Sequence, residues 1–327
     1  MAPSRIEDSS DEDVQGTGHK EATVYMIDTM HPDAMEYAKT KFNLILPSDP
    51  ECRNWRQNAT ALLVRGSYVT AADIKCSPNL IAIGKQGVGI DKIDQSACAE
   101  RRIAILNTPG ANAQAVAEMV LALTMAVARQ IRSIAIRQLL SVPLAKEQCS
   151  GLTIHGKTIG ILGMGNIGRK VAEMFKGAFN AKIVAYDPFM PAHAWSGIPH
   201  QRVSTVQEVL ESADVLTIHV PLTAETRDLI SYKELSLMKR EAILINAARG
   251  GIVQEDDLQR ALKEGLIWGA GLDCHGQEPP TRERYASLWD NLNVVSTPHV
   301  GAATSDTQFI TAKAAIDNLY KYLNART

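Results

Sequence analysis

The chain has 327 residues, of which 45% are hydrophobic and 21% are charged. This length exceeds what one hydrophobic core usually organises, so it predicts a soluble globular protein of two domains. The 34 basic and 36 acidic side chains give a net charge of −2. Such a balance lacks the basic excess that binds phosphate backbones or anionic lipids, so neither nucleic acid nor a membrane is predicted as a partner.

The five cysteines show neither zinc-ribbon nor redox CxxC spacing, which predicts reduced thiols and no metal site. The sequence has no run of about 18 apolar residues and no apolar segment near its start, so it predicts a cytoplasmic protein without a membrane span. Residues 1–20 include the acidic stretch EDSSDED at 7–13 and are predicted to form a disordered tail. A partner-binding role for this tail stays open.

Short apolar runs alternate with helical patterns in the first third of the chain. This alternation is typical of a parallel sheet covered by helices. The predicted strands are 23–27, 44–46, 61–64, 80–83 and 103–106.

A long apolar pattern over 113–140 predicts one helix, with Asn112 as its N-cap and Pro143 just beyond its end. Its wide apolar face predicts burial between two layers or against a partner subunit. Beyond it the alternation resumes, which predicts a second doubly wound unit. Its predicted strands are 158–162, 182–186, 215–219, 242–246, 269–273 and 294–296, and its helices are 166–179, 205–211 and 255–264. A last helix, 306–323, is predicted to pack back onto the first domain.

The sequence GMGNIG at 163–168 lies between a predicted strand and a predicted helix. Gly163 suits the tight turn, Gly165 lets backbone amides approach a pyrophosphate, and Gly168 permits close packing of the helix on the strand. Asp187 follows 19 residues after the last glycine, where a carboxylate binds a ribose 2′-hydroxyl and repels a 2′-phosphate. These residues predict binding of NAD(H) rather than NADP(H), although a glycine-rich turn without a ligand and an ordinary turn aspartate remain alternatives.

Three further predicted strands are followed by segments that carry charged or titratable side chains. Arg249 lies in NAARGG, Glu278 in DCHGQEP, and His299 in TPHVGA. Because ligands of open α/β sheets bind outside the carboxyl ends of the strands, these side chains are predicted to converge on one crevice.

Six segments together resemble the D-isomer-specific 2-hydroxyacid dehydrogenases. They occur in that family's order: GVGIDKID at 87–94, NTPGANAQAVAE at 107–118, GMGNIG at 163–168, NAARGG at 246–251, GLDCHGQEP at 271–279 and TPHVGAAT at 297–304. The resemblance implies an α/β fold in which a Rossmann NAD-binding domain, 108–298, is inserted into a flavodoxin-like catalytic domain, 21–107 plus 299–327. It also implies a homodimer packed through the NAD-binding domains.

By this resemblance, Arg249, Glu278 and His299 match the family's catalytic arginine, glutamate and histidine. Reduction of a 2-oxo acid needs a hydride and a proton, and a histidine suits the proton transfer. A carboxylate at Glu278 would orient the imidazole and favour its protonated form. The guanidinium of Arg249 would bind the substrate and stabilise charge developing on oxygen. A surface arginine, a capping glutamate and a packed histidine are the alternatives, and His275 competes for the acid/base role.

The resemblance implies further contacts with the cofactor and the substrate. The positions that correspond to cofactor contacts are Val88, Val116, Asn166, Ile167, Val220, Ala247, Ala248, Arg249, Asp273, His299, Val300, Gly301 and Ala302, beside the glycines and Asp187 above. Substrate contacts are predicted for Val88, Gly89, Arg249 and His299. Arg65 is a candidate second anion contact, because phosphoglycerate dehydrogenases have an Arg-Ser pair there, but Gly66 intervenes here.

Two features depart from the family's pattern. His275 and Gly276 replace its usual aromatic-acid pair, and its tryptophan is missing from 141–156. No regulatory domain follows Thr327, which disfavours the serine-regulated phosphoglycerate dehydrogenases. Candidate substrates are glyoxylate, hydroxypyruvate, pyruvate, bulkier 2-oxo acids and 3-phosphoglycerate.

Other members suggest alternatives: an NAD-sensing module like the C-terminal-binding-protein corepressors, or oxidation of formate or phosphite. Hinges for domain closure are predicted near 107–109 and 296–298.

Overall fold

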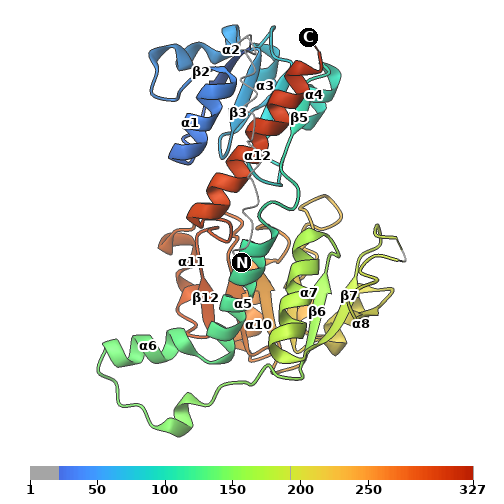
Figure 1. Ribbon diagram of the computed structural model, residues 1–327. Coiled ribbons are helices and arrows are strands. Elements are labelled where there is room, and N and C mark those ends of the chain that lie inside the picture. The colour runs from blue at the N-terminus through green and yellow to red at the C-terminus, as the bar shows by residue number, and fades with distance from the viewer. Residues whose placement is uncertain (1–21, 192, 327) are drawn as a thin grey trace, which may run out of the picture.

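The computed structural model describes residues 22–191 and 193–326. It contains two parallel sheets, of five and seven strands, each flanked by helices (Figure 1). The predicted α/β fold class is confirmed. The predicted tail at 1–20 lies outside the described residues.

The first sheet has the strand order β2-β1-β3-β4-β5, which is the flavodoxin-like order of doubly wound folds. Its strands are β1 (Thr23–Met26), β2 (Asn43–Ile45), β3 (Ala61–Val64), β4 (Ala82–Lys85) and β5 (Ala104–Leu106). Its helical segments are α1 (Pro32–Lys41), η1 (Pro50–Asn54), α2 (Trp55–Asn58), α3 (Ala71–Lys75) and α4 (Gln95–Glu100). Strand β4 begins and ends two residues later than the strand that the sequence predicted at 80–83.

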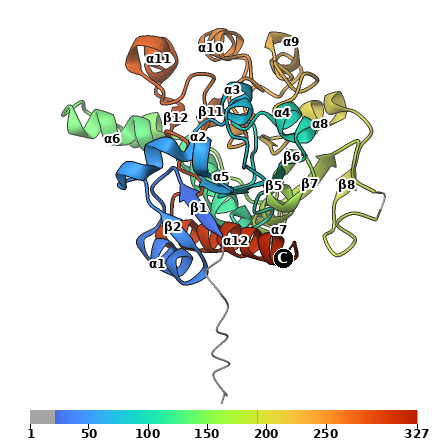
Figure 2. The same ribbon diagram turned by 90° about the horizontal axis from the view of Figure 1, so that it is seen from above.

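The C-terminal helix α12 (Ser305–Asn324) covers one face of the first sheet beside α1 (Figures 1 and 2). Its buried side chains share a core with α1 and the central strands. Gly84 in β4 makes this packing close, because a Cβ there would lie 3.3 Å from the carbonyl oxygen of Ala315. The prediction that the last helix packs back onto the first unit is confirmed.

The second sheet has the order β12-β11-β10-β9-β6-β7-β8, with every neighbouring pair parallel. The strand order reverses between β6 and β9, and such a switch point is where a doubly wound sheet binds its ligand. The strands are β6 (Thr158–Leu162), β7 (Lys182–Tyr186), β8 (Gln201–Arg202), β9 (Val215–Ile218), β10 (Ile243–Asn246), β11 (Gly269–Leu272) and β12 (Val294–Ser296).

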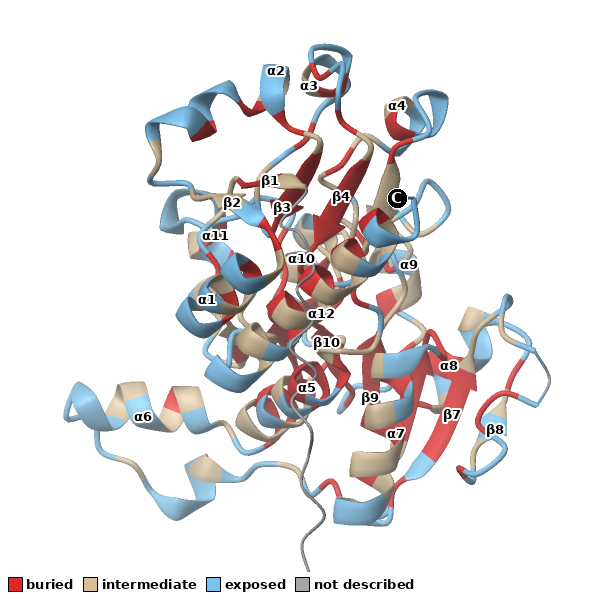
Figure 3. Ribbon diagram, turned by 45° about the horizontal axis from the view of Figure 1, so that its top comes forward, coloured by how far each residue is buried: buried red, intermediate tan, exposed pale blue. Residues whose placement is uncertain are grey.

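Helices cover both faces of the second sheet, and its central strands are buried (Figure 3). The helical segments of this unit are α5 (Ala113–Ala128), α6 (Ile131–Leu139), which projects away from the sheet, η2 (Lys146–Cys149), α7 (Asn166–Phe179), α8 (Val206–Ser212), α9 (Tyr232–Leu235), α10 (Glu255–Lys263) and α11 (Arg282–Trp289). The domain boundaries predicted at 107–108 and 298–299 stay predictions, although β5 ends at Leu106 and β12 at Ser296.

The single helix predicted over 113–140 is wrong, because the chain breaks between α5 and α6. Gln130 adopts the left-handed conformation with φ of 53°, and its side chain donates a hydrogen bond to the carbonyl of Ser150. The carbonyl of Ala128, at the end of α5, accepts from the amide of Leu152. The returning chain therefore satisfies the end of α5, and α6 leaves at 61°.

Within the described ranges, no single helix has both the length and the hydropathy to cross a membrane. Taken together, α5 and α6 pass that test of length and composition only as a bent pair.

Candidate active site

Loops from both sheets meet at the carboxyl ends of β4, β10, β11 and β12. Arg249 follows β10, and its Nε donates a hydrogen bond of 3.0 Å to Oδ1 of Asp91, in the loop after β4. Its Nη1 donates to the carbonyl of Ala248 at 2.7 Å. The side chain of Asn246 supports this loop with two hydrogen bonds. Its Nδ2 donates to the carbonyl of Arg249, and its Oδ1 accepts from the amide of Ala248. Arg249 is thereby fixed between the two sheets.

Gly89 lies directly against the Arg249 guanidinium. A Cβ on Gly89 would lie 1.6 Å from Nη2 of Arg249 and 2.6 Å from Oδ1 of Asp91. Burial alone would raise the pKa of the Asp91 carboxyl, but the charge and hydrogen bond of Arg249 hold that pKa below its ordinary value. Only a glycine therefore leaves room for the guanidinium at this place.

His299 and Glu278 form the second pair of the site. Nδ1 of His299 lies 3.0 Å from each carboxylate oxygen of Glu278. Burial alone would raise the pKa of the Glu278 carboxyl, but the hydrogen bond and charge of His299 and the amide of His275 hold it below its ordinary value. With Nδ1 held by the carboxylate, Nε2 is the ring nitrogen left for another partner.

Asp273 is buried beneath the loop that carries His299. Its Oδ1 accepts from the hydroxyl of Thr297 at 2.6 Å and from the amide of Val300 at 2.8 Å, while its Oδ2 accepts from the amide of Gly301 at 2.8 Å. Inside this loop His299 has φ of 58°, in the left-handed region. Asp273 therefore holds the loop on both sides of His299, through Thr297 before it and Val300 and Gly301 after it. The sequence predicted only a contact of Asp273 with the cofactor, not this structural role.

The glycine-rich turn lies at the switch point, between β6 and α7. Gly163 has φ of 97°, and a Cβ there would lie 2.6 Å from the carbonyl oxygen of His219. A Cβ on Gly168 would lie 2.2 Å from the carbonyl oxygen of Gly163. Around Gly165, by contrast, no described atom lies within 4 Å of such a Cβ. The first and third glycines are thus required by packing, whereas the second faces open space, as close approach of a dinucleotide requires.

Asp187 follows β7 and faces this turn. Its Oδ2 accepts from the amide of Met164 at 2.8 Å, and its Oδ1 accepts from the amide of Phe189 at 2.9 Å. A pocket opens between the turn and the segment after Asp187. Its lining includes the predicted residues Gly165 and Asn166 and, beyond the prediction, Met164, Arg169, Met190, Pro191, His193, Ala194, Trp195, Ser196 and Gly197. No local spacing in the sequence marked the residues at 190–197.

The other predicted cofactor positions lie along the same strand ends. Val116, Ala247, Ala248 and Gly301 are buried, whereas Ile167, Val220, Val300 and Ala302 are half-buried. His219, which the sequence analysis did not select, lies next to Val220 with its Nε2 2.9 Å from the hydroxyl of Thr217. Burial lowers the pKa of its imidazole to about 3, so this ring is neutral.

Lys85, at the end of β4, is a charged group that sequence reasoning missed. Its Nζ donates to the carbonyls of Arg65 at 2.5 Å and Gln86 at 2.8 Å. Burial, only partly offset by the Asp91 carboxylate, lowers the pKa of this ammonium to about 8. A Cβ on Gly87 would lie 3.7 Å from Nζ, so Lys85 lies beneath the segment predicted to bind the substrate.

Arg65 and Val88, both predicted substrate contacts, are exposed at this edge of the first sheet. The amides of Arg65, Gly66 and Ser67 all donate to Asp28, so the backbone here already binds a carboxylate. The carbonyl of Val88 accepts from Nδ2 of Asn107 at 2.6 Å, which ties this loop to the predicted hinge.

The ring of His275 is buried away from the crevice. Its Nε2 lies 2.8 Å from the hydroxyl of Ser296, and its ring meets that of Tyr285 edge-on at 5.0 Å. These contacts favour the structural interpretation of His275 over the acid/base role, and both stay predictions. The preceding residue, Cys274, is buried close to the His299–Glu278 pair, and burial raises the pKa of its thiol.

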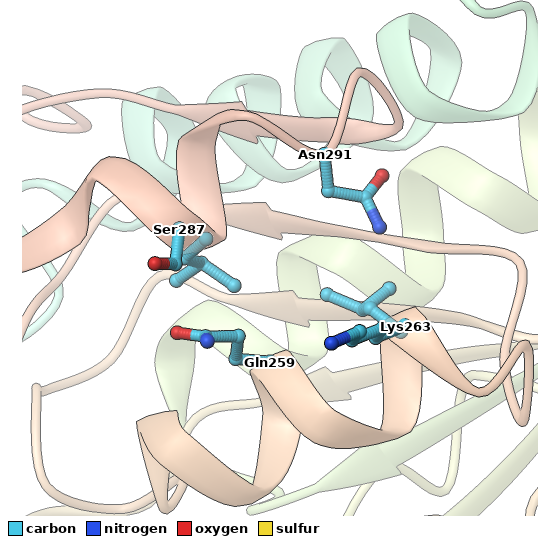
Figure 4. A pocket seen from close by; sticks show the side chains of 6 residues that line it. Gln259, Lys263, Ser287 and Asn291 are labelled. Atoms are coloured by element: carbon cyan, nitrogen blue, oxygen red, sulfur yellow. The ribbon is translucent and has the colours of Figure 1, made fainter.

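A separate pocket lies between α10 and α11, away from these loops. Figure 4 shows the side chains of Gln259 and Lys263 rising from α10 toward Ser287 and Asn291. None of the residues that line it belongs to the predicted site.

The sequence pattern described as "D-isomer specific 2-hydroxyacid dehydrogenase, NAD binding domain" matches residues 96–301. The chain belongs to this family. It is 37% identical over 268 residues to D-3-phosphoglycerate dehydrogenase of Methanocaldococcus jannaschii, covering 82% of this chain and 50% of that protein. It is also 37% identical over 263 residues to hydroxypyruvate reductase of Thermotoga maritima, covering 80% of this chain and 84% of that protein.

The chain spans about half the length of the phosphoglycerate dehydrogenases that it matches. Among solved structures, protein TT0316 of Thermus thermophilus is similar with a TM-score of 0.82 and 32% identity, covering 93% of this chain and 97% of that one. Solved relatives include a complex with NAD and an NADPH-dependent reductase.

Proposed function

We propose that the chain is an NAD(H)-dependent oxidoreductase that interconverts a small 2-oxo acid and its D-2-hydroxy acid. The observation that carries this proposal is the His299–Glu278 pair, held beside Arg249 at the strand ends of the sheet that carries the Gly163–Gly168 turn. Family membership supports the reaction class, and the open space at Gly165 fits a bound dinucleotide.

Each side chain has a distinct part in the reduction. NADH held at the Gly163–Gly168 turn would supply the hydride for the carbonyl carbon of the substrate. His299 donates a proton from Nε2 to the carbonyl oxygen, while Glu278 holds Nδ1–H and thereby orients the ring. The guanidinium of Arg249 binds the substrate and stabilises negative charge on its oxygen. In the reverse direction, His299 accepts the hydroxyl proton.

NAD(H) is favoured over NADP(H) because the Asp187 carboxylate faces the glycine-rich turn. Each carboxylate oxygen has a second lone pair beyond its bond to a backbone amide, so Asp187 can still accept a ribose hydroxyl. A 2′-phosphate there would meet a like charge.

The substrate side of the crevice favours an anion. Arg249 lies against Gly89, and Nζ of Lys85 lies near Gly87 in the same segment. A 2-oxo acid carboxylate bound to the amides of this segment would lie close to both cations. Arg65 stays a candidate for a second anionic group, such as a substrate phosphate.

The test is oxidation of NADH with a panel of glyoxylate, hydroxypyruvate, pyruvate and bulkier 2-oxo acids, together with reduction of NAD⁺ by 3-phosphoglycerate, which is already a 2-hydroxy acid. We expect the wild type to turn over at least one of these substrates. The His299→Ala variant should lose this turnover while it still binds NADH. The alternative is an NAD-sensing interaction module of the same fold. Binding of NADH without turnover of any substrate would overturn the enzyme proposal and support this alternative.

We also infer a homodimer that packs through α6 and the second sheet's unit. Ile131, Leu139, Leu140 and Val142 are exposed apolar side chains on or just after α6, and α6 projects away from the rest of the chain in both ribbon views (Figures 1 and 2). Apolar side chains gathered in this way mark an interaction surface. Sedimentation of the wild type as a dimer and of Leu139→Glu as a monomer is expected, whereas a monomeric wild type would refute the inference.

A substrate between two sheets also implies closure of one lobe on the other. The carbonyl of Asn107 accepts from Asn318 of α12, and its side chain donates to Val88. The proposed hinge is thus bonded to the substrate segment. Scattering curves that do not change when NADH and a substrate analogue are added together would contradict closure.

A further inference from the structure

Cys274 lies beneath the proposed catalytic pair and is not used by the proposed reaction. Its Sγ, a carboxylate oxygen of Glu278 and a ring nitrogen of His299 all lie within 4.8 Å of one another. The thiol is buried, with 2% of the residue exposed, whereas the side chains of His299 and Glu278 are 39% and 30% exposed. The cluster is therefore open on its carboxylate and imidazole side and closed on its sulfur side.

We propose that Cys274, Glu278 and His299 form a site for a thiophilic divalent cation, such as Zn²⁺ or Cd²⁺, which reversibly blocks the enzyme. Sulfur, nitrogen and oxygen donors together favour these ions over Mg²⁺ or Ca²⁺, which take oxygen ligands. The cluster also offers three protein ligands and leaves an open position toward the crevice, the pattern of accessible zinc sites.

The geometry needs little change. Ligand distances of zinc place the three donor atoms about 3.4–3.6 Å apart in a tetrahedron. Nδ1 of His299 is already 3.0 Å from both oxygens of Glu278, and no pair in the cluster exceeds 4.8 Å. Side-chain rotations alone can close differences of this size.

The charges also permit a cation. Two positive charges act on the cluster: Arg249, which is paired with Asp91 at 3.0 Å, and Lys92, whose Nζ lies over the ring of Tyr68. On binding, the S–H bond of Cys274 breaks, its proton goes to solvent, and a metal–sulfur bond forms, so nothing is oxidised or reduced. In the part of the chain that the structure describes, this is the only group of three such side chains within ligand distance.

Metal binding would replace the hydrogen bond between His299 and Glu278. Nδ1 would bind the ion instead of donating to the carboxylate, so the Nδ1 proton would pass to solvent and the imidazole would be neutral with its hydrogen on Nε2. The open coordination position would face the substrate. The inhibitory effect rests on the proposed function, but binding of the ion does not.

The decisive experiment is a titration of the apoprotein with Co²⁺ and Cd²⁺, followed by the sulfur-to-metal charge-transfer absorption. The wild type should show this band at one equivalent, and Cys274→Val should lose it with a fall in affinity of at least about tenfold. Cys76→Ser, which removes an exposed thiol remote from the cluster, is the matched control and should keep both. Cys274→Ser serves as a second variant if the valine variant fails to fold.

A band of equal strength in folded Cys274→Val, or no band in the wild type, would overturn the proposal. In the activity measurement, Zn²⁺ should inhibit the wild type and Cys76→Ser alike, and a chelator should reverse the inhibition. Half-inhibition of Cys274→Val, measured against its own rate without Zn²⁺, should need at least about tenfold more Zn²⁺. If no turnover is found at all, the proposed function fails while the spectroscopic result still decides the metal site.

Discussion

Gly89→Ala should impair substrate binding although it removes no functional group. The new Cβ would lie 1.6 Å from Nη2 of Arg249, which is far inside van der Waals contact. The guanidinium ends a flexible side chain, so it can swing away and the fold should survive. Its hydrogen bonds to the substrate carboxylate are then lost. Such charge-assisted bonds contribute about 1.5–3 kcal/mol each, so kcat/KM should fall about 10- to 150-fold.

The matched control is Gly66→Ala, in the loop after β3. No described atom lies within 4 Å of a Cβ at Gly66, and neither glycine has the positive φ that would strain an alanine. Steady-state kinetics with NADH and the best 2-oxo acid, together with thermal unfolding, separate the two substitutions. Equal kcat/KM in both variants would refute the assignment of Arg249 as the residue that binds the substrate. A lower melting temperature in Gly89→Ala alone would refute the claim that the Arg249 side chain moves aside without straining the fold.

Two further substitutions test other groups of the site. Because the pKa of Lys85 falls from 10.5 to about 8 in the folded chain, its burial costs stability below pH 8 and that cost disappears between pH 8 and 10.5. The free energy of unfolding of the wild type, from urea titrations, should therefore gain about 3 kcal/mol over this interval relative to Lys85→Met; parallel pH profiles would contradict it. Asp187→Ala should raise kcat/KM with NADPH relative to NADH by at least about tenfold. An unchanged ratio would show that Asp187 only bonds to the amides of Met164 and Phe189.

The features that sequence could predict are those set by local spacing. The Gly163–Gly168 turn joins β6 to α7 within six residues, and its helix begins and ends where the pattern placed it, at Asn166 and Phe179. The break after α5 could not be predicted in this way. It depends on Leu152 and Ser150, 20 or more residues along the chain, which bond to Ala128 and Gln130.

The placement of charges follows the same division. Arg249, Glu278 and His299 each follow a strand of one parallel sheet, so the rule for strand ends brings them to one edge. Asp91 and Lys85 come from the other sheet, and no spacing in the sequence records how the two sheets face each other. Cys274 differs again, because it neighbours the predicted Asp273 but faces a different partner. Asp273 accepts from the amides of Val300 and Gly301, whereas Cys274 lies within ligand distance of Glu278 and His299. A metal-binding cluster can therefore arise beneath a dehydrogenase site without any metal-binding motif in the sequence.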